Sequence, residues 1–278
     1  MSIPDVILID DPTDERFAQF RLNERGLASR TQKRDDAGAG RFLAEGDLVV
    51  ERAAAAGCVP VAALVDVDRV PTLAAALDCP VYGGGAHVRR VVSGLGVPLS
   101  IIALFERPRR PTVEEAAATA SRLVVVEAVD NPANVGAIVR NAAGLGWDGL
   151  VLDHTSADPL SRRALRVAMG TTFDLPHART RHLSDAVDAL VGHGFRVYAL
   201  TPDADADDLD GVAPAATDRV ALTVGSERAG LSPELLERTI PVRIPMQRGV
   251  DSLNVAAATA IGCWALRRRP GASVPGQR

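Results

Sequence analysis

Five short apolar runs in the second half of the chain constrain its fold more than any other feature. They cover residues 123–127, 149–153, 195–200, 219–224 and 242–244, and segments with helical spacing lie at 135–146, 160–169, 183–192, 233–238 and 253–268. Runs such as Leu123–Val126 lack the alternation of polar and apolar residues that a half-exposed strand shows, so we expect strands buried on both faces. The pattern predicts an α/β fold with a parallel sheet and helices on both of its faces.

The first half of the chain predicts a smaller α/β unit. Residues 42–56 have apolar residues at helical spacing, and short apolar runs typical of strands lie at 59–65, 79–82 and 99–105. Between the halves, 107–121 opens with RPRRP and continues as a small, charged stretch that is typical of a linker. We therefore expect an N-terminal domain over 1–106, a linker over 107–121 and a C-terminal domain over 122–278.

Composition excludes several classes of protein. With 278 residues, 47% of them hydrophobic, the chain can build a large core. Its 3 cysteines are widely spaced and its 5 histidines show no ligand spacing, so neither a disulfide framework nor a metal site is expected. The longest apolar run, 255–266, is too short to span a bilayer, and the acidic start lacks the features of a secretory signal. These features predict a cytoplasmic protein with no membrane partner.

Arginine clusters, rather than the total charge, indicate a possible nucleic-acid partner. The net charge is −4, but phosphate binding depends on local basic patches. Arginine offers a planar fork of donors that suits phosphate oxygens, and it can stack on exposed bases. The alternative is that such clusters only solvate helix surfaces. The candidate RNA-binding residues are Arg30, Lys33, Arg34, Arg89 and Arg90.

Three loops that follow predicted strands are rich in polar residues and glycine. They read DNPANVGAIVRN at 130–141, VGSERAGL at 224–231 and IPMQRGVDSLN at 244–254. Asn134 can cap the helix that begins in the first loop. Ligands of open α/β sheets bind beyond the carboxyl ends of the strands, where these loops lie, so we expect their polar side chains to converge on one crevice. These side chains are Asn134, Arg140, Glu227, Ser252 and Asn254.

The three loops together resemble a known family. NxGxxxR at Asn134–Arg140, GSExxGL at Gly225–Leu231 and IPM…SLNVA at Ile244–Ala256 are similar to the signature motifs of the SpoU (TrmH-type) branch of the SPOUT RNA methyltransferases. The resemblance covers residues 122–268 and implies S-adenosylmethionine as cofactor, a homodimer and a C-terminal domain with a deep trefoil knot. Chains generally avoid knots, so the knot is implied by the resemblance alone. More loosely, the N-terminal part over 1–106, with FLAEG at Phe42–Gly46 before a helix, resembles an L30e-like RNA substrate-binding domain.

The resemblance also implies roles for single residues. The catalytic set would be Asn134, Arg140, Glu227, Ser252 and Asn254. Contacts to the cofactor would come from Leu200, Thr201, Pro202, Gly225, Gly230, Ile244, Met246 and Leu253. A guanidinium keeps its proton in proteins, so we expect Arg140 to bind phosphate and stabilise a developing alkoxide, within a subunit or across the dimer, rather than act as a base. Glu227 either orders Arg140 or satisfies nearby backbone amides.

The predicted function is methylation of a ribose 2′-hydroxyl in structured RNA, with ribosomal RNA favoured over transfer RNA as substrate. A non-catalytic RNA-binding protein of the same fold is the alternative, and the intact Asn134, Arg140 and Asn254 argue against it. A dinucleotide-dependent oxidoreductase is not supported, because no GxGxxG follows the predicted strand at 123–127.

Overall fold

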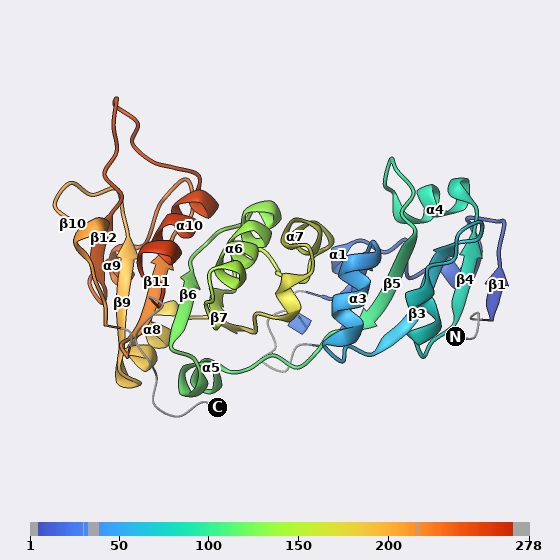
Figure 1. The fold of residues 1–278 in the computed structure, drawn as a ribbon, viewed down its shortest axis with the longest axis horizontal. Coiled ribbons are helices and arrows are strands. Elements are labelled where there is room, and N and C mark those ends of the chain that lie inside the picture. Colours follow the sequence, from blue (N-terminus) through green and yellow to red (C-terminus); the bar gives the residue numbers. More distant parts are fainter. Residues whose placement is uncertain (1–4, 30, 33–38, 216, 269–278) are drawn as a thin grey trace. The chain divides into compact units, whose positions relative to one another are not determined.

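The computed structural model describes residues 5–29, 31–32, 39–215 and 217–268. The chain forms two compact units (Figure 1). Unit 1 comprises Met1–Arg109 and Asp158–Asp174, and unit 2 comprises Arg110–Ala157 and Leu175–Arg278. The chain first passes from unit 1 to unit 2 between residues 109 and 110, inside the predicted linker. A contiguous N-terminal domain, however, is not what the structure shows, because residues 158–174 also belong to unit 1.

Unit 1 is built on a five-stranded sheet in the order β1-β4-β3-β5-β2. β5 runs antiparallel to β2 and β3, whereas the other neighbouring pairs are parallel. The strands are β1 (Val6–Leu8), β2 (Arg41–Glu45), β3 (Pro60–Asp66), β4 (Val81–Gly84) and β5 (Ile101–Glu106). The helices of this unit are η1 (Glu15–Phe17), α1 (Glu24–Leu27), α3 (Asp47–Ala55), η2 (Thr72–Ala76), α4 (Ala86–Ser93), α7 (Arg162–Ala168) and η3 (Thr171–Phe173).

The predicted helix over 42–56 is wrong in its first part. Arg41–Glu45 is strand β2, and the helix begins at Asp47. Gly46 separates the two elements with a φ of +89°, a left-handed conformation that glycine adopts without strain. Phe42 and Leu43 lie in different core clusters, so the strand is buried on both faces and its apolar run does not distinguish it from a helix.

Helix α7 joins unit 1 through a buried carboxylate and two leucines. Glu45 is 3% exposed and accepts hydrogen bonds from the guanidinium groups of Arg162 and Arg166. Leu160 and Leu165 belong to the same core cluster as strands of the five-stranded sheet. Although α7 stands between two strands of unit 2 in the sequence, it is part of the N-terminal core.

Unit 2 contains a seven-stranded sheet in the order β10-β12-β9-β11-β6-β7-β8, and every neighbouring pair is parallel. The predicted parallel sheet is therefore confirmed, although β8 and β10 are additional to the five predicted strands. The strands are β6 (Arg122–Val126), β7 (Gly149–Asp153), β8 (His177–Thr180), β9 (Phe195–Leu200), β10 (Asp207–Asp208), β11 (Arg219–Val224) and β12 (Ile240–Arg243).

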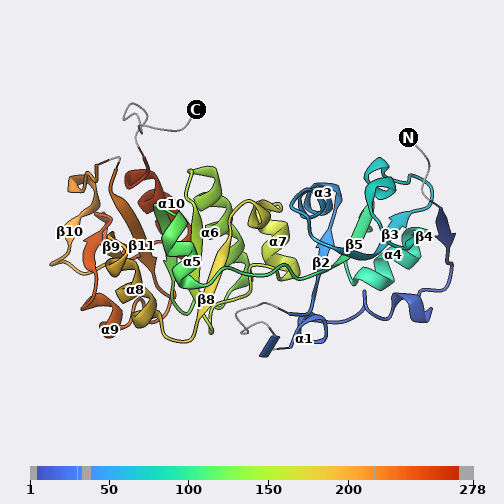
Figure 2. The same cartoon turned by 90° about the horizontal axis from the view of Figure 1, so that it is seen from below.

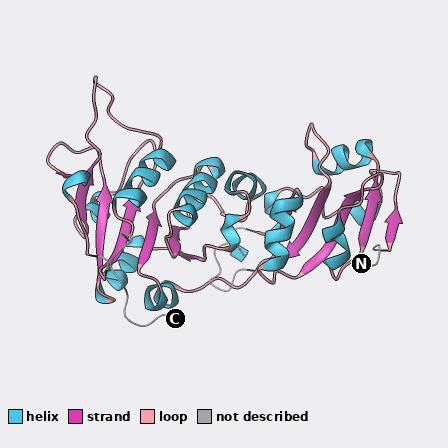
Figure 3. Ribbon diagram, viewed as in Figure 1, coloured by secondary structure: helices cyan, strands magenta, loops and turns pink. Residues whose placement is uncertain are grey.

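Helices cover both faces of this sheet, as predicted (Figure 3). Ala117 of one helix and Leu190 of another pack with Ala221 of β11 on one face. Gly262 approaches Leu222, the next residue of β11, so closely that a Cβ would lie 2.6 Å from it, and this contact is on the opposite face. The helices are α5 (Val113–Thr119), α6 (Pro132–Gly144), α8 (Leu183–Gly192), η4 (Leu209–Gly211), α9 (Pro233–Leu236) and α10 (Val255–Ala265). α6 and α10 lie side by side in both views (Figures 1 and 2).

Helix α5 occupies 7 residues of the predicted linker over 107–121. Thr112 and Glu115 form a capping box, in which each side chain accepts a hydrogen bond from the other residue's backbone N–H, at 2.9 and 3.1 Å. Val113 and Ala117 are buried in the core of unit 2. The linker prediction is wrong from residue 113 to residue 119, because small and charged residues here form one amphipathic helix.

Two general features hold for the part of the chain that the structure describes. None of its helices is long and apolar enough to cross a membrane. No group of histidine, cysteine, aspartate and glutamate side chains there is arranged to hold a metal ion. The knot and the L30e likeness of unit 1 stay predictions.

Candidate functional site

The three motif loops lie at one edge of the seven-stranded sheet. All neighbouring strands are parallel, so the carboxyl ends of β6, β9, β11 and β12 share this edge. The segments over 127–131, 225–232 and 244–254, which carry or lead into the three motifs, start there. The turn over 201–206, after β9, starts there too. The loop between β12 and α10, orange to red in Figure 1, stands out beyond the strands.

Hydrogen bonds join one side chain from each motif loop. Asn134 donates from Nδ2 to Oε1 of Glu227, and Asn254 donates from Nδ2 to Oδ1 of Asn134 at 3.1 Å. Asn254 also caps α10, since its Oδ1 accepts from the N–H of Ala256 at 3.0 Å. Asn134 is half-buried, and the other two side chains are exposed. These three residues, called the polar cluster below, present oriented amide and carboxylate groups at the sheet edge.

The residue that caps α6 is Asn131 rather than Asn134. Oδ1 of Asn131 accepts from the N–H of Ala133 at 2.9 Å, and Pro132 occupies the first helical position. The predicted cap at Asn134 is therefore wrong. Because Asn134 lies in the first turn, its amide bonds to the other loops instead. The Asn-Pro dipeptide is the sequence signal that locates the true start of the helix.

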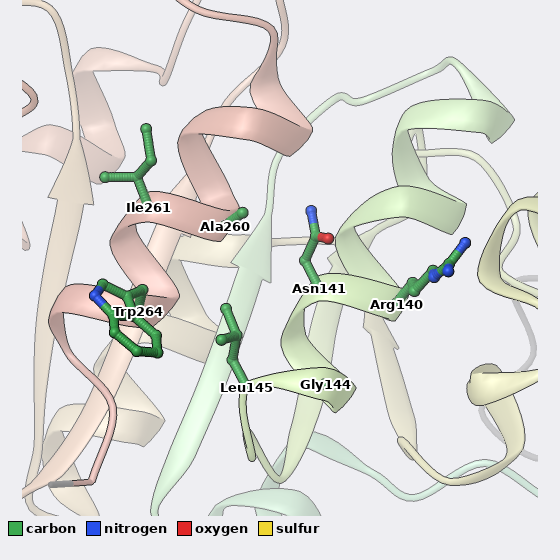
Figure 4. A pocket seen from close by; sticks show the side chains of 7 residues that line it. All are labelled: Arg140, Asn141, Gly144, Leu145, Ala260, Ile261 and Trp264. Atoms are coloured by element: carbon green, nitrogen blue, oxygen red, sulfur yellow. The ribbon is translucent and has the colours of Figure 1, made fainter.

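Arg140 does not join the polar cluster within one chain. An α-helix turns about 100° per residue, so Arg140, which follows Asn134 by six residues, lies on a different side of α6. Asn141 lies on the Asn134 side and donates to the carbonyl oxygen of Ala256 at 3.0 Å. Arg140 is exposed, extends away from α10 in Figure 4, and makes no hydrogen bond or ion pair with any described residue. The expectation that all five polar side chains converge on one crevice is therefore wrong within this chain, because Arg140 does not reach the other four.

Ser252 is likewise outside the polar cluster. It is exposed in the loop between β12 and α10 and has no hydrogen bond to another residue that the structure describes. It stands two residues before Asn254, so it lies at the same sheet edge without contributing to the hydrogen-bonded arrangement.

The predicted cofactor-binding residues lie around the same edge. Thr201 donates its N–H to the carbonyl oxygen of Val242 at 3.0 Å, which fixes the turn after β9 against β12. Leu253 is 38% exposed although apolar, and Ile244 and Met246 are half-buried. Exposed apolar side chains of this kind are the surface that a cofactor with a planar ring needs. The predicted residues outside the glycine loop, all at least partly exposed, are Leu200, Thr201, Pro202, Ile244, Met246 and Leu253.

The loop after β11 folds back tightly on itself. A Cβ at position 225 would lie 2.3 Å from the backbone C and O of Gly230 and 2.5 Å from the N of Leu231. Gly230 has a φ of +67° and donates its N–H to the carbonyl oxygen of Ser226 at 3.0 Å. Glu127 anchors the end of the loop, because its Oε2 accepts from the N–H of residue 232 at 2.7 Å. Sequence reasoning missed Glu127, which no motif includes.

The candidate RNA-binding residues divide into three groups. Arg89 is 4% exposed, forms an ion pair with Asp66 at 2.8 Å and donates to the carbonyl oxygen of Gly84 at 3.1 Å. Its assignment to an RNA-binding surface is wrong, because the guanidinium stabilises the interior of unit 1. Arg90 is exposed on α4 and stays a candidate. The remaining candidates lie outside the described residues; they are Arg30, Lys33 and Arg34.

Comparison with known proteins identifies the family. The model of the SpoU rRNA Methylase family matches residues 121–264, a range that contains all three motif loops and the polar cluster. The chain belongs to the SpoU rRNA methylase family. This confirms the family that the motifs predict.

Similarity within the SpoU family extends over nearly the whole chain. An uncharacterised tRNA/rRNA methyltransferase of Mycobacterium bovis is 38% identical over 268 residues, which cover 94% of this chain and 91% of the relative. RlmP of Bacillus subtilis, a 23S rRNA (guanosine(2553)-2′-O)-methyltransferase, is 34% identical over 231 residues, or 81% and 88% of the two chains. The crystal structure of an AdoMet-bound rRNA methyltransferase from Sinorhizobium meliloti matches with a TM-score of 0.80 and 26% identity, covering 94% of this chain and 97% of the other.

Proposed function

We propose that this SpoU-family chain is a cytoplasmic homodimer that transfers a methyl group from S-adenosylmethionine to a ribose 2′-hydroxyl of ribosomal RNA. The observation that carries the proposal is the hydrogen-bonded polar cluster, which combines Asn134, Glu227 and Asn254 from three loops beside an exposed apolar surface. The similarity to RlmP supports the reaction, and the similarity to an AdoMet-bound rRNA methyltransferase supports the cofactor.

The residues at the sheet edge fit S-adenosylmethionine. Ile244, Met246 and the exposed Leu253 would hold the adenine, while backbone groups around Thr201 and Gly225 would form hydrogen bonds to its polar atoms. The close packing at Gly225 leaves no room for a side chain at this position, so the backbone of residues 225 and 230 can approach closely. When bound there, the cofactor supplies an electrophilic methyl group on a sulfonium.

The chain's own residues would orient the ribose and compensate charge. The amide of Asn134 is held in one orientation from two sides, by Glu227 and Asn254, so it can position a hydroxyl without reorganising. A guanidinium remains protonated in proteins, so Arg140 would bind the neighbouring phosphate and stabilise negative charge that develops on the ribose oxygen.

Arg140 would act in the site of a second copy of the chain. It lines, with residues of α6 and α10, an open hollow of about 520 Å³ (Figure 4). Trp264 and Ile261 are 57% and 41% exposed in this hollow, and such adjoining apolar side chains are typical of surfaces that another subunit covers. Arg140 and Asn134 lie on different sides of α6. If a second subunit packs on this surface, Arg140 of one subunit would reach the polar cluster of the other.

Methyl transfer to RNA tests the proposal. Purified protein is incubated with radiolabelled S-adenosylmethionine and with ribosomal RNA or transfer RNA, and the labelled nucleotide is mapped as a 2′-O-methyl ribose. We expect label in ribosomal RNA. Label only in transfer RNA would contradict ribosomal RNA as the substrate. Cofactor binding without transfer to either RNA would contradict the proposed activity.

Subunit mixing tests the role of Arg140. Arg140→Ala and Asn254→Ala are each expected to lower kcat at least about 100-fold, the loss typical of removing one transition-state contact. If Arg140 acts across the dimer, random mixing of the two inactive variants restores about a quarter of wild-type activity, because half of the dimers contain one intact site. A mixture that stays inactive would place Arg140 in its own subunit's site.

A further inference from the structure

The loop from β6 to α6 has a strained backbone at its start. Ala128 adopts a φ of +53°, in the left-handed region that residues other than glycine rarely occupy. Such a conformation persists only where surrounding contacts hold it, and it tends to occur near functional sites. This loop leads to Asn131, the cap of α6, and to Asn134 of the polar cluster.

The carboxylate of Asp153, the last residue of β7, holds this strained segment. Its Oδ1 accepts from the N–H of Ala128 and of Ser156, both at 3.0 Å, and its Oδ2 accepts from the N–H of Thr155 at 3.1 Å. The hydroxyl groups of Thr155 and Ser156 also donate to it, and Ser156 Oγ accepts from the N–H of Val129 at 3.1 Å. Asp153 is 9% exposed. Burial raises the pKa of this carboxyl, but the hydrogen bonds outweigh burial and lower it below the ordinary value.

The same hydrogen-bond network continues toward the polar cluster. Val129 accepts, through its carbonyl oxygen, a hydrogen bond from the N–H of Ala157 at 2.8 Å. Two residues later Asn131 caps α6, which fixes where the helix begins. The start of the helix determines which side of it each residue occupies, and therefore whether Asn134 reaches the two other motif loops.

We propose that Asp153 is a positioning residue for the reaction. Its carboxylate holds Ala128 in the left-handed conformation, and this sets the start of α6 and the place of Asn134. The effect on catalysis rests on the proposed function, whereas the effect on the loop rests on the hydrogen bonds alone. Asp153 lies outside all three motifs and touches none of the residues assigned to the cofactor.

Asp148 provides a matched control at the other end of the same strands. Its Oδ2 accepts from the N–H groups of Ser121 and Arg122, both at 2.8 Å. It therefore anchors the amino end of β6 as Asp153 anchors the segment after its carboxyl end. Replacing either aspartate removes a carboxylate that binds backbone N–H groups, but only Asp153 is beside the motif loops.

Asp153→Ala and Asp148→Ala are compared in the full-length protein. We expect Asp153→Ala to lower kcat for methyl transfer by about tenfold or more, since hydrogen bonds to a charged acceptor contribute at least that factor, with KM for S-adenosylmethionine changed less than about threefold. Backbone amides of residues 128–134 should exchange hydrogen faster. Asp148→Ala should lower the melting temperature but leave kcat and this exchange unchanged. Adding Ala128→Gly to Asp153→Ala should restore most of kcat, because glycine adopts a positive φ without support.

Equal losses of kcat in the two alanine variants, or no restoration by Ala128→Gly, would overturn the proposal. If Asp153→Ala does not fold, Asp153→Asn is used instead, because it keeps one acceptor oxygen. It should show a smaller loss of kcat and a smaller increase in hydrogen exchange at residues 128–134. Hydrogen exchange separates this proposal from the proposed function. A wild-type protein without methyl transfer contradicts the function, yet faster exchange confined to residues 128–134 in the variant still supports the role of Asp153, and unchanged exchange refutes it.

Discussion

A single methyl group at position 225 would collide with the backbone of its own loop. Gly225→Ala places a Cβ 2.3 Å from Gly230, and no flexible side chain can move to relieve this contact. We expect the free energy of unfolding to fall by about 1–3 kcal/mol, as in other overpacked sites, and S-adenosylmethionine to bind at least about tenfold more weakly. Denaturant unfolding and calorimetry measure the two effects. Gly192→Ala on α8, where nothing lies within 4 Å of the added Cβ, is the control: it should not lower the free energy of unfolding and should leave cofactor binding unchanged. Wild-type binding by Gly225→Ala would contradict this assignment.

At the same scale, the sequence indicates which residues gather at the site but not all of the contacts among them. Asn134, Glu227 and Asn254 follow parallel strands, and the rule that such strands end at one edge brings them together. The place of Arg140 depends on the exact start of α6, which motif order does not contain. Arg89 was misassigned because charge clustering does not reveal burial.

At the scale of elements, the Glu45 carboxylate binds two arginines of α7 and so helps to attach this helix to unit 1. Glu45→Gln would leave the guanidinium groups of Arg162 and Arg166 without a charged acceptor. Those arginine side chains are 21% and 33% exposed, so we expect a loss of about 2–4 kcal/mol in unfolding free energy, somewhat less than for a fully buried pair. Urea denaturation tests this, with Glu51→Gln on the exposed side of α3 as the control. Equal stability of the two variants would show that the ion pairs contribute nothing.

The sequence predicts closely the elements whose apolar residues recur at a clear spacing, and the errors elsewhere have local causes. Helix 183–192 and strand 149–153 agree with α8 and β7. The strand before Gly46 was included in a helix because a doubly buried strand and a helix both appear as short apolar runs. β8 reads HART and has no apolar run, so the sequence does not indicate a strand there. Its Arg179 can be buried because the carbonyl oxygens of Asp153 and Ser156 accept its hydrogen bonds, and only the tertiary structure shows these contacts. The capping box of α5, in contrast, was readable in advance.

At the scale of the whole molecule, the chain passes between its two units three times, after residues 109, 157 and 174. The sequence predicts a boundary only where composition changes, as it does at RPRRP. The two later crossings lie inside the region that carries the methylase motifs, and nothing in their composition separates 158–174 from its neighbours. The packing of Leu160 and Leu165 into the N-terminal core and the ion pairs of α7 with Glu45 reveal them.

This interrupted arrangement predicts that unit 1 cannot be isolated as a contiguous fragment. Residues 1–109 alone lack α7, so Glu45 loses both guanidinium partners and the core loses two leucines. We expect this fragment to show no cooperative thermal transition by circular dichroism, because several kcal/mol is a large share of a small unit's stability. A synthetic peptide of residues 158–174 should restore the transition in a saturable way, whereas the same peptide with Leu160→Asp and Leu165→Asp should not. A fragment that melts cooperatively without the peptide would mean that α7 is attached to unit 1 without being needed for its folding.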